Sequence, residues 1–398
     1  MDSRLFLNGL ATVQGPYPFE QLLSVQDALE AREVIGGLPN YAATPLRELR
    51  DVASAAGVGR VFYKDEDQRF TLHSFKILGA GYAIAKLLRK LISAHLETPV
   101  STADLISQRY TEWLEHKVIA CASAGNHGRA VAAIAKLFGV RCRIFLPSAV
   151  SNTRRRAISE LDAEVVTVHG DYDAAVRFAS DAATADANIE LVSDTSWSGS
   201  ESAPLDIMRG YSVLMLEATE QLMAAAGAVT HVFVQGGVGG LAASVCAYLW
   251  RTYGSRYPIV IVAEPETADC LFQSARARMP RPTSGDLSTI MSGLACGEVS
   301  LLAWRVLSKG AHAFIKLSDA ETIAAMKMLS LADVGRPTIV AGESGAAGLA
   351  AFLACASNPR RRDRLNLTRR SQVLLIGTEG ATDPELYSRL MTACGSPP

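Results

Sequence analysis

Two kinds of hydrophobic pattern alternate along much of this chain. Short apolar runs rich in β-branched residues are typical of buried strands, and longer stretches with apolar residues at every third or fourth position are typical of helices. One series of runs predicts strands at 117–122, 141–146, 164–168 and 189–192, separated by a helix that ends near Phe138 and by helices at 151–161 and 172–185. The other runs predict strands at 61–66, 230–234, 257–262 and 371–376.

The alternation of strand and helix is the βαβ pattern of parallel sheets, and it occurs in two separate series. The sequence therefore predicts an α/β fold with two doubly wound, open-sheet domains. We expect residues 1–80 and 225–398 to form the larger domain and residues 81–224 to form the smaller one. A chain of 398 residues, of which 49% are hydrophobic, can bury a substantial core.

Charge and cysteine content narrow the classes of partner. The 39 Lys and Arg residues nearly balance the 40 Asp and Glu residues, so no overall positive field favours nucleic acid or an anionic membrane. The seven cysteines form no CxxC pair, and no histidine stands at ligand spacing from any of them. This pattern argues for reduced thiols and against a zinc site or a disulfide framework. The first residues hold too short an apolar run for a secretion signal. We therefore expect a cytoplasmic protein with no membrane segment, no bound metal and a small-molecule partner.

Glycine-rich segments follow several predicted strands, at the edge of parallel sheets where helices begin and ligands bind. They are residues 123–128, 235–240, 342–345 and 377–380. Gly237–Ala242, which begins in the second segment, also fits the G-x-G-x-x-A pattern of dinucleotide sites. Glu264 lies at the end of the next predicted strand, where a carboxylate would bind a ribose. Any phosphate held by glycine amides needs a similar pattern, and several βα units precede this one. A nicotinamide-dependent oxidoreductase therefore remains an alternative.

Lys76 stands at the predicted start of an apolar helix, in the segment Ser74-Phe-Lys-Ile-Leu-Gly79. Its apolar neighbours would desolvate the amine and lower its pKa, which an amine that forms a Schiff base requires. A surface lysine whose methylene groups lie along apolar side chains would give the same local pattern. The segment alone leaves both interpretations open.

Several motifs taken together are more informative than any one of them. Their order along the chain is Thr44-Pro-Leu46, Lys64-Asp-Glu66, Ser74-Phe-Lys76, Ser123-Ala-Gly-Asn-His127 and Gly236-Gly-Val-Gly-Gly240. In this order the chain resembles the fold type II pyridoxal-phosphate enzymes, the tryptophan synthase β-like superfamily. Within that superfamily it is most similar to the diaminopropionate ammonia-lyase family, on residues 64–70, 125–129, 193–199, 207–211, 342–345 and 377–384.

This resemblance implies that pyridoxal phosphate binds in a cleft between the two domains, with the larger domain binding the cofactor and the smaller one facing the substrate. Lys76 would bind the cofactor covalently and, once released, remove the Cα proton of the substrate. Asn126 would hydrogen-bond the 3′ oxygen of the cofactor ring, and Thr378 would lie near the pyridine nitrogen. The backbone amides that would bind the phosphate are those of Gly236, Gly237, Val238, Gly239 and Gly240.

The resemblance also implies which residues would face the substrate, namely Ser123, Ala124, Gly125, His127 and Asp194. Ser123 and the local helix N-terminus would hold the substrate carboxylate. Asp194 would pair with a β-ammonium group and steer it as it leaves. Without the resemblance, Asp194 would fit the N-cap of a helix near Trp197 equally well, and Asn126 and His127 would fit a helix cap and a buried structural ring.

Ala124 departs from the lyase family, which has an aspartate at this position, on the cofactor face opposite the lysine. Alanine has no proton to exchange, so we hypothesise that only the L enantiomer reacts, from the Lys76 side. The alanine affects the expected stereochemistry and leaves the expected reaction class unchanged.

As a whole, the resemblance implies a homodimeric, pyridoxal-phosphate-dependent lyase. It would carry out α,β-elimination on an L-alanine with a β-amino or β-hydroxyl group, such as 2,3-diaminopropionate, to give a 2-oxo acid (pyruvate) and ammonia. Alternatives in the same superfamily are an L-threonine or L-serine dehydratase and a β-replacement synthase. A ligand-binding relative without activity is a further alternative, against which the presence of Lys76, Ser123 and Asn126 argues.

Overall fold

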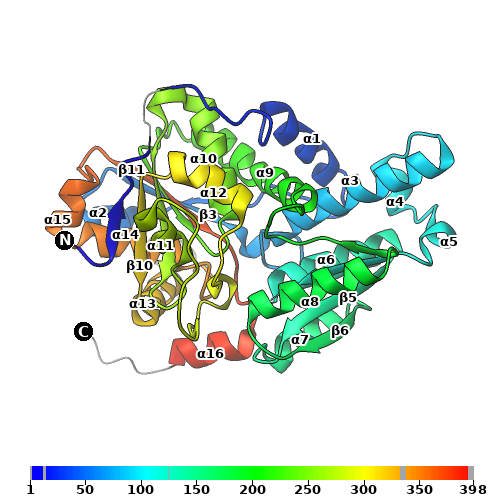
Figure 1. Ribbon diagram of the computed structural model, residues 1–398. Helices are drawn as coiled ribbons and strands as arrows, with labels where there is room; N and C mark the ends of the chain where they lie inside the picture. Colours follow the sequence, from blue (N-terminus) through cyan, green and yellow to red (C-terminus); the bar gives the residue numbers. More distant parts are fainter. Residues whose placement is uncertain (1, 12–14, 124, 332–337, 393–398) are drawn as a thin grey trace. The chain divides into compact units, whose positions relative to one another are not determined.

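The computed structural model describes residues 2–11, 15–123, 125–331 and 338–392 (Figure 1). The chain folds as two compact units. The larger unit consists of Met1–Gln21, Ala43–Ser74 and Met215–Pro398, and the smaller unit of Leu22–Ala42 and Phe75–Leu214. Each unit has its own sheet, which confirms the predicted fold class of two open-sheet α/β domains.

The larger unit contains a seven-stranded sheet in the order β1-β10-β9-β8-β11-β3-β2. The five inner strands are parallel, and the three-residue edge strands β1 and β2 are antiparallel to their neighbours. Parallel strands covered on both faces need apolar residues at nearly every position, and the run HVFVQ of β8 is buried throughout. In chain order the strands are β1 (Leu5–Leu7), β2 (Leu46–Glu48), β3 (Arg60–Asp65), β8 (His231–Gln235), β9 (Ile259–Pro265), β10 (Ala313–Leu317) and β11 (Gln372–Gly377).

Helices cover both faces of this sheet. Helices α13 and α14 contribute to the apolar core cluster, in which Phe352 of α14 packs edge-on against Phe233 of β8 with 5.6 Å between ring centroids. Helix α10 also contacts β8 but contributes nothing to that cluster, so it covers the other face. The helices of the unit are α2 (Arg50–Ala56), α10 (Gly240–Tyr253), α11 (Cys270–Ala277), α12 (Leu301–Gly310), α13 (Asp319–Ser330), α14 (Ala347–Ala356), α15 (Pro359–Arg364) and α16 (Pro384–Thr392).

The smaller unit contains a four-stranded parallel sheet in the order β6-β5-β4-β7. The strands are β4 (Val118–Ala122), β5 (Arg141–Pro147), β6 (Glu164–Val168) and β7 (Ile189–Leu191). Its helices are α1 (Val25–Gly36), α3 (Lys76–Leu96), α4 (Thr102–Ile106), α5 (Thr111–Leu114), α6 (Asn126–Phe138), α7 (Asn152–Ser159) and α8 (Tyr172–Ala185). Helix α9 (Ser202–Ala224) begins in this unit and ends in the larger one.

Helices also cover both faces of the smaller sheet. Ala175 and Ala179 of α8 belong to a core cluster with Phe145 of β5. The neighbouring residue Ile144 points to the opposite face, where its side chain lies against Gly128 of α6. The predicted doubly wound arrangement is therefore present, with α6 and α8 on opposite sides of β5.

A buried ionic cluster fixes the end of β3 to α9 within the larger unit. Lys64 lies 2.7 Å from Glu217, and Arg69 lies 2.7 Å from both Glu66 and Glu217. The Lys64 ammonium also donates to the carbonyl of Thr44. Burial alone would raise the pKa of Glu217, but Arg69 and Lys64 hold it below its ordinary value. Two cations thus balance two carboxylates away from water, as buried charges require.

The hydrophobic pattern predicts eight of the strands to within three residues at either end but does not predict β1, β2 and β10. The edge strands are too short to show alternation, and β10 carries Lys316 within its five residues. In the described parts of the chain, no helix is long and apolar enough to cross a membrane.

Candidate active site

Lys76 is the first residue of α3 in the smaller unit, as the sequence predicts. Its ammonium lies 5.4 Å from the ring centroid of Phe75 and 5.9 Å from that of Tyr211. The side chain is 19% exposed. The amine therefore lies close to two aromatic rings, which the amine of a surface lysine does not, and the side chain remains partly accessible.

Asp194 binds the Lys76 amine directly. Its Oδ2 lies 2.6 Å from Lys76 Nζ, and its Oδ1 accepts a hydrogen bond of 2.7 Å from the hydroxyl of Tyr172. Burial alone would raise the pKa of Asp194, but the charge of Lys76 and the two hydrogen bonds hold it below its usual value. The alternative interpretation of Asp194 as the N-cap of a helix near Trp197 is wrong, because the next helix begins at Ser202.

Tyr172 is a site residue that the sequence analysis does not identify. It is the first residue of α8, directly after the turn that follows β6, and it is buried. Asp171 caps this helix by accepting a hydrogen bond from the amide of Ala174, so the cap fixes where the tyrosine begins the helix. A signal was present, because Tyr172 lies at the edge of the sheet where ligands of parallel sheets bind.

Ser123 follows β4 and lies at the N-terminus of α6. Its Oγ accepts hydrogen bonds from the amides of Gly125 (2.9 Å) and Gly128 (2.8 Å). Both bonds use the oxygen as acceptor, so the hydroxyl proton remains able to donate to a carboxylate. Gly125 has φ of +148°, and a Cβ there would lie 3.1 Å from Cδ of Arg154. Ala124, between them, lies outside the described residues.

The next two residues of this segment differ in burial. Asn126 is the first residue of α6 and is partly exposed, with Gly125 in the N-cap position, so Asn126 does not cap this helix. His127 is buried, and its Nε2 donates to the carbonyl of Val192 at 2.9 Å. Burial lowers the pKa of His127, which favours a neutral ring with the proton on Nε2. Its Nδ1 is buried and has no hydrogen-bond partner among the described residues.

In the larger unit, Gly236–Gly240 forms a glycine cradle between β8 and the start of α10. Gly237 and Gly239 have φ of +61° and +102°, which glycine adopts without strain. The amide of Gly236 donates to Ala263 and that of Gly239 to Gly236. The amides of Gly237, Val238 and Gly240 make no such bond within the described chain. Together with the helix N-terminus, these amides can bind a phosphate.

Glu264 lies directly beneath this cradle. A Cβ on Gly236 would come within 2.7 Å of Glu264 Cγ, so Gly236 makes room for that side chain. The Glu264 carboxylate is fully buried and accepts hydrogen bonds from the amides of Leu271 (2.8 Å) and Phe272 (2.7 Å) at the start of α11. It cannot bind a ribose from that position, so the dinucleotide alternative loses its carboxylate.

Thr378 directly follows β11, the strand beside β8. The residue is buried, so its hydroxyl lies at the carboxyl edge of the sheet away from bulk water. The preceding Gly377 has to be glycine, because a Cβ there would lie 2.1 Å from the ring of Tyr63. The side-chain amide of Gln235 donates through Nε2 to the carbonyl of Ile376 and so ties the end of β8 to that of β11.

The predicted site residues thus fall into two groups, one in each unit. Lys76, Asp194 and the segment 123–128 belong to the smaller unit, and the glycine cradle and Thr378 belong to the larger one. The first group supplies an amine, a carboxylate and hydrogen-bonding groups, and the second supplies amides suited to an anion. Among the residues that the structure describes, no group of three or more His, Cys, Asp or Glu could hold a metal ion.

Comparisons with known proteins agree on one family. A family model described as "Pyridoxal-phosphate dependent enzyme" matches residues 38–378. The diaminopropionate ammonia-lyase of Salmonella typhimurium is 36% identical over 361 residues, which cover 89% of this chain and 89% of that protein. The crystal structure of diaminopropionate ammonia-lyase from Escherichia coli with an aminoacrylate–PLP azomethine reaction intermediate matches with a TM-score of 0.87 and 34% identity, over 98% of this chain and 96% of that one. Another structure of that enzyme, in complex with D-serine, matches with a TM-score of 0.86 and 33% identity over the same shares of the two chains.

Proposed function

Because this chain belongs to the family of pyridoxal-phosphate dependent enzymes and, within it, to the diaminopropionate ammonia-lyases, we propose that it carries out α,β-elimination on an L-2,3-diaminopropionate-like substrate. The products would be a 2-oxo acid, pyruvate in the simplest case, and ammonia. The observation that carries the proposal is the contact of 2.6 Å between the Lys76 amine and the Asp194 carboxylate.

The residues present fit pyridoxal phosphate in three respects. The amides of Gly237, Val238 and Gly240 have no partner in the described chain and stand at a helix N-terminus, where a phosphate binds. Thr378 is a buried residue directly after β11, and its hydroxyl would donate to the pyridine nitrogen. Lys76 would hold the cofactor covalently. When bound, the cofactor supplies an electron sink for the charge that develops at Cα.

Lys76 and Asp194 have roles that depend on one another. Asp194 holds the Lys76 amine in place and favours its protonated form. To act as the base at Cα, Lys76 has to give up that proton, which leaves the buried carboxylate without its cation. A β-ammonium group of the substrate would replace that cation, and we propose that Asp194 binds it until it leaves. A β-hydroxyl group could not restore the charge balance, so a diamino acid should be preferred over serine.

The substrate carboxylate would bind at the N-terminus of α6. The helix dipole and its first amides favour an anion there, and the Ser123 hydroxyl can donate to it. The unpartnered Nδ1 of His127 is an acceptor, so it would receive a hydrogen bond from the substrate and not from an ionised carboxylate. The segment after β4 is therefore proposed to bind two groups. Ser123, Gly125 and His127 would bind the substrate, and Asn126 would bind the 3′ oxygen of the cofactor ring.

The proposal is tested first by spectroscopy and product analysis. The purified holoenzyme should show a visible absorbance band that shifts when L-2,3-diaminopropionate is added. It should release two ammonia per pyruvate from that substrate and one from L-serine. The value of kcat/KM should be about 10- to 150-fold higher for the diamino acid, since a hydrogen bond to a charged group contributes about 1.5–3 kcal/mol. A higher kcat/KM for L-serine or L-threonine would identify a dehydratase instead.

A β-replacement synthase remains the second candidate within the family. A synthase needs an acceptor, so adding an amine or a thiol would accelerate substrate consumption and lower the yield of pyruvate. We expect both quantities to stay unchanged for the lyase.

The stereochemical hypothesis rests on Ala124, which carries no titratable group. With Lys76 as the base, the L enantiomer should react and the D enantiomer should not. Comparable turnover of D- and L-2,3-diaminopropionate would contradict this hypothesis and require a second base.

Three further expectations belong to the same proposal. We propose a homodimer in the cytoplasm, and a division of roles in which residues 1–80 and 225–398 bind the cofactor and residues 81–224 face the substrate. The placement of the glycine cradle and Thr378 in the larger unit, and of segment 123–128 in the smaller one, supports that division. Lys76 lies within residues 1–80 but belongs to the smaller unit. Light scattering of the holoenzyme would give the oligomeric state.

A further inference from the structure

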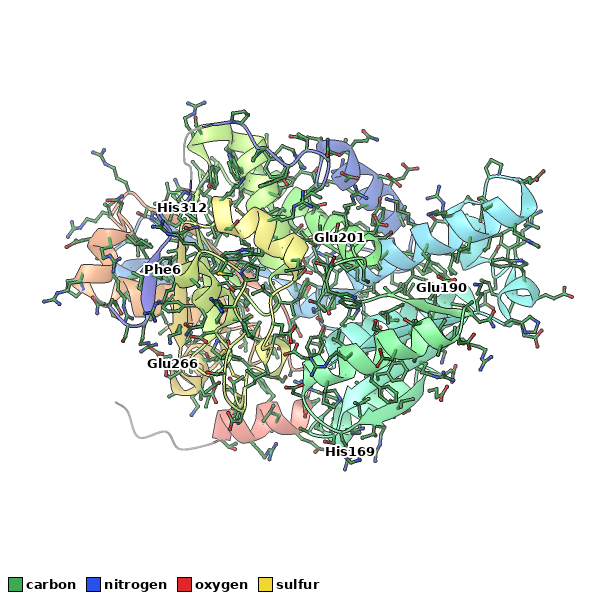
Figure 2. The ribbon with its side chains drawn as sticks, in the orientation of Figure 1. Phe6, His169, Glu190, Glu201, Glu266 and His312 are labelled. Carbon is green, nitrogen blue, oxygen red and sulfur yellow. The ribbon has the colours of Figure 1, made fainter. Side chains whose placement is uncertain are left out.

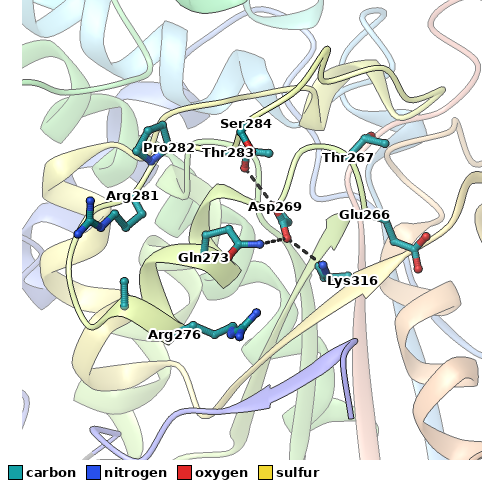
Figure 3. Close-up of a pocket in the computed structure, with 11 residues that line it drawn as sticks. Glu266, Thr267, Asp269, Gln273, Arg276, Arg281, Pro282, Thr283, Ser284 and Lys316 are labelled. Carbon is teal, nitrogen blue, oxygen red and sulfur yellow. Dashed lines mark hydrogen bonds and ion pairs between the residues drawn. The ribbon is translucent and has the colours of Figure 1, made fainter. Parts of the chain in front are cut away.

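A pocket lies in the larger unit, at the carboxyl ends of β9 and β10. It has a volume of about 610 Å³. Figure 2 labels Glu266, which directly follows β9 at this place, and Figure 3 draws the lining side chains. These are Glu266, Thr267, Asp269, Gln273, Arg276, Ala277, Arg281, Pro282, Thr283, Ser284 and Lys316. The carboxyl edge of parallel strands is where open α/β sheets bind ligands.

Asp269 at the centre of this lining is already satisfied. Its Oδ2 accepts a hydrogen bond of 2.7 Å from Gln273 and lies 3.1 Å from the ammonium of Lys316. Its Oδ1 accepts a bond of 3.1 Å from the hydroxyl of Thr283. These contacts are the dashed lines of Figure 3. The carboxylate thus orders helix α11, strand β10 and the loop 281–284 around the pocket.

The remaining charges of the pocket do not balance. Glu266 has a cation partner, Arg4, at 3.0 Å, and Asp269 has Lys316. Arg276 and Arg281 are exposed, and neither forms an ion pair with any residue that the structure describes. The pocket therefore carries two uncompensated guanidinium groups, which are suited to bidentate contacts with carboxylates or phosphates.

Helix α11 connects this pocket to the glycine cradle. Gln273, Arg276 and Ala277 of α11 line the pocket. At the other end of the helix, the amides of residues 271 and 272 donate to Glu264 beneath the cradle, and the thiol of Cys270 lies 3.6 Å from the carbonyl oxygen of Gly237. A ligand that holds α11 against β10 would therefore also restrain the support of the cradle.

We propose that this pocket is a binding site for a small anion with two or more carboxylate or phosphate groups, and that its occupation is linked to cofactor retention through α11. Arg276 and Arg281 bind the anion, and Lys316 and Ser284 complete the polar wall. The linkage rests on the proposed function, because it assumes that the cradle holds the cofactor phosphate. The binding itself does not.

The test is calorimetry on the holoenzyme with citrate and, separately, with inorganic pyrophosphate, which distinguishes a carboxylate from a phosphate ligand. We expect one site per chain for at least one of them, and at least ~10-fold weaker binding in the double variant Arg276→Gln/Arg281→Gln. The matched control is Arg360→Gln/Arg364→Gln, which removes the same charge from exposed positions of α15 and should leave the affinity unchanged. No binding of either anion, or equal weakening in both variants, would overturn the site.

The linkage is tested by gel filtration of the holoenzyme with and without the anion. The anion should at least halve the fraction of cofactor lost, measured by visible absorbance, and should have no such effect on the Arg276→Gln/Arg281→Gln variant. An equal loss of cofactor from the natural chain with and without the anion would overturn the linkage. A greater loss with the anion would mean that it competes at the cradle, which also overturns the linkage. If the protein does not bind the cofactor on which the linkage rests, this is recognised separately, because the purified protein would then show no cofactor absorbance at all.

Discussion

Two lysine–carboxylate pairs of almost the same length serve this protein in different ways. Lys64 and Glu217 lie 2.7 Å apart in the larger unit, and Lys76 and Asp194 lie 2.6 Å apart in the smaller one. The side chains of the first pair are 0% and 2% exposed, and those of the second pair 19% and 9%. The first pair belongs to a cluster of two cations and two carboxylates, whereas the second faces two aromatic rings and a tyrosine hydroxyl.

The difference shows that an ion pair alone does not identify a reactive lysine. Lys64 donates to three oxygens, those of Thr44, Glu217 and Gln221, so its ammonium is saturated and shut off from water. Lys76 lies where a ligand can reach it, at the first residue of a helix. Saturation and burial favour a structural role for the first pair, and accessibility at the edge of a sheet favours a chemical role for the second.

The largest effect should come from Lys76→Ala. Without the amine, kcat should fall by at least ~10⁴-fold, since both the covalent link and the base are removed. Mass spectrometry of the borohydride-treated holoenzyme should find the cofactor attached to the natural chain and not to the variant. Lys86→Ala is the control, because Lys86 belongs to the same helix and pairs with Asp206; it should keep both activity and attachment.

Lys64→Met should act on stability instead of chemistry. It leaves Glu217 buried with one cation fewer, which should lower the free energy of unfolding by about 3–5 kcal/mol. Denaturant titration measures this loss, and the protein that remains folded should keep its kcat. Adding Glu217→Gln should restore part of the stability, since it removes the unbalanced charge. A large loss of kcat in folded Lys64→Met would break the distinction between the two pairs.

Asp194→Asn should lower kcat/KM about 100-fold for L-2,3-diaminopropionate and less than 10-fold for L-serine. The amide keeps the shape of the carboxylate but cannot balance a β-ammonium charge. Steady-state rates on both substrates measure the ratio.

Tyr172→Phe is the milder comparison for Asp194, because it keeps the carboxylate and removes one hydrogen bond. We expect kcat/KM for L-2,3-diaminopropionate to fall about 10-fold in steady-state measurements.

An equal loss of kcat/KM on the diamino and hydroxy substrates in Asp194→Asn would contradict the recognition of a β-ammonium group by Asp194. The role of Asp194 would then be to position Lys76.

The last comparison concerns Glu264, a buried carboxylate that forms no ion pair with the described residues. Burial raises its pKa from 4.5 to about 8, whereas the cations around Glu217 lower the pKa of that residue. Between pH 4.5 and 8 the folded state therefore binds more protons at Glu264 than the unfolded state. Its contribution to stability is complete below pH 4.5 and is lost as the pH rises through 8.

Glu264→Gln should remove this dependence. The free energy of unfolding, measured by denaturant titration at pH 5.5 and at pH 8.5, should change by roughly 3 kcal/mol less between the two values than in the natural chain. The same pH dependence in both proteins would show that another group causes it.

Much of the fold follows from local pattern. Strands buried on both faces have to be apolar at nearly every position, which is why β4, β8, β9 and β11 are visible as almost uninterrupted runs. The short edge strands β1 and β2 form because β10 and β3 offer unpaired backbone groups, and this cannot be seen in three residues of sequence.

The site shows the same division. The sequence by itself determined that Lys76 begins a helix and that glycines follow β8, because helix starts and turns depend on neighbouring residues. Only the tertiary structure decided that Tyr172 binds Asp194 and that Glu264 lies under Gly236. These partners are distant in sequence, and an isolated tyrosine or glutamate looks alike whether it caps a helix, fills a core or faces a substrate. Which of these it does depends on the groups that packing brings within hydrogen-bond distance.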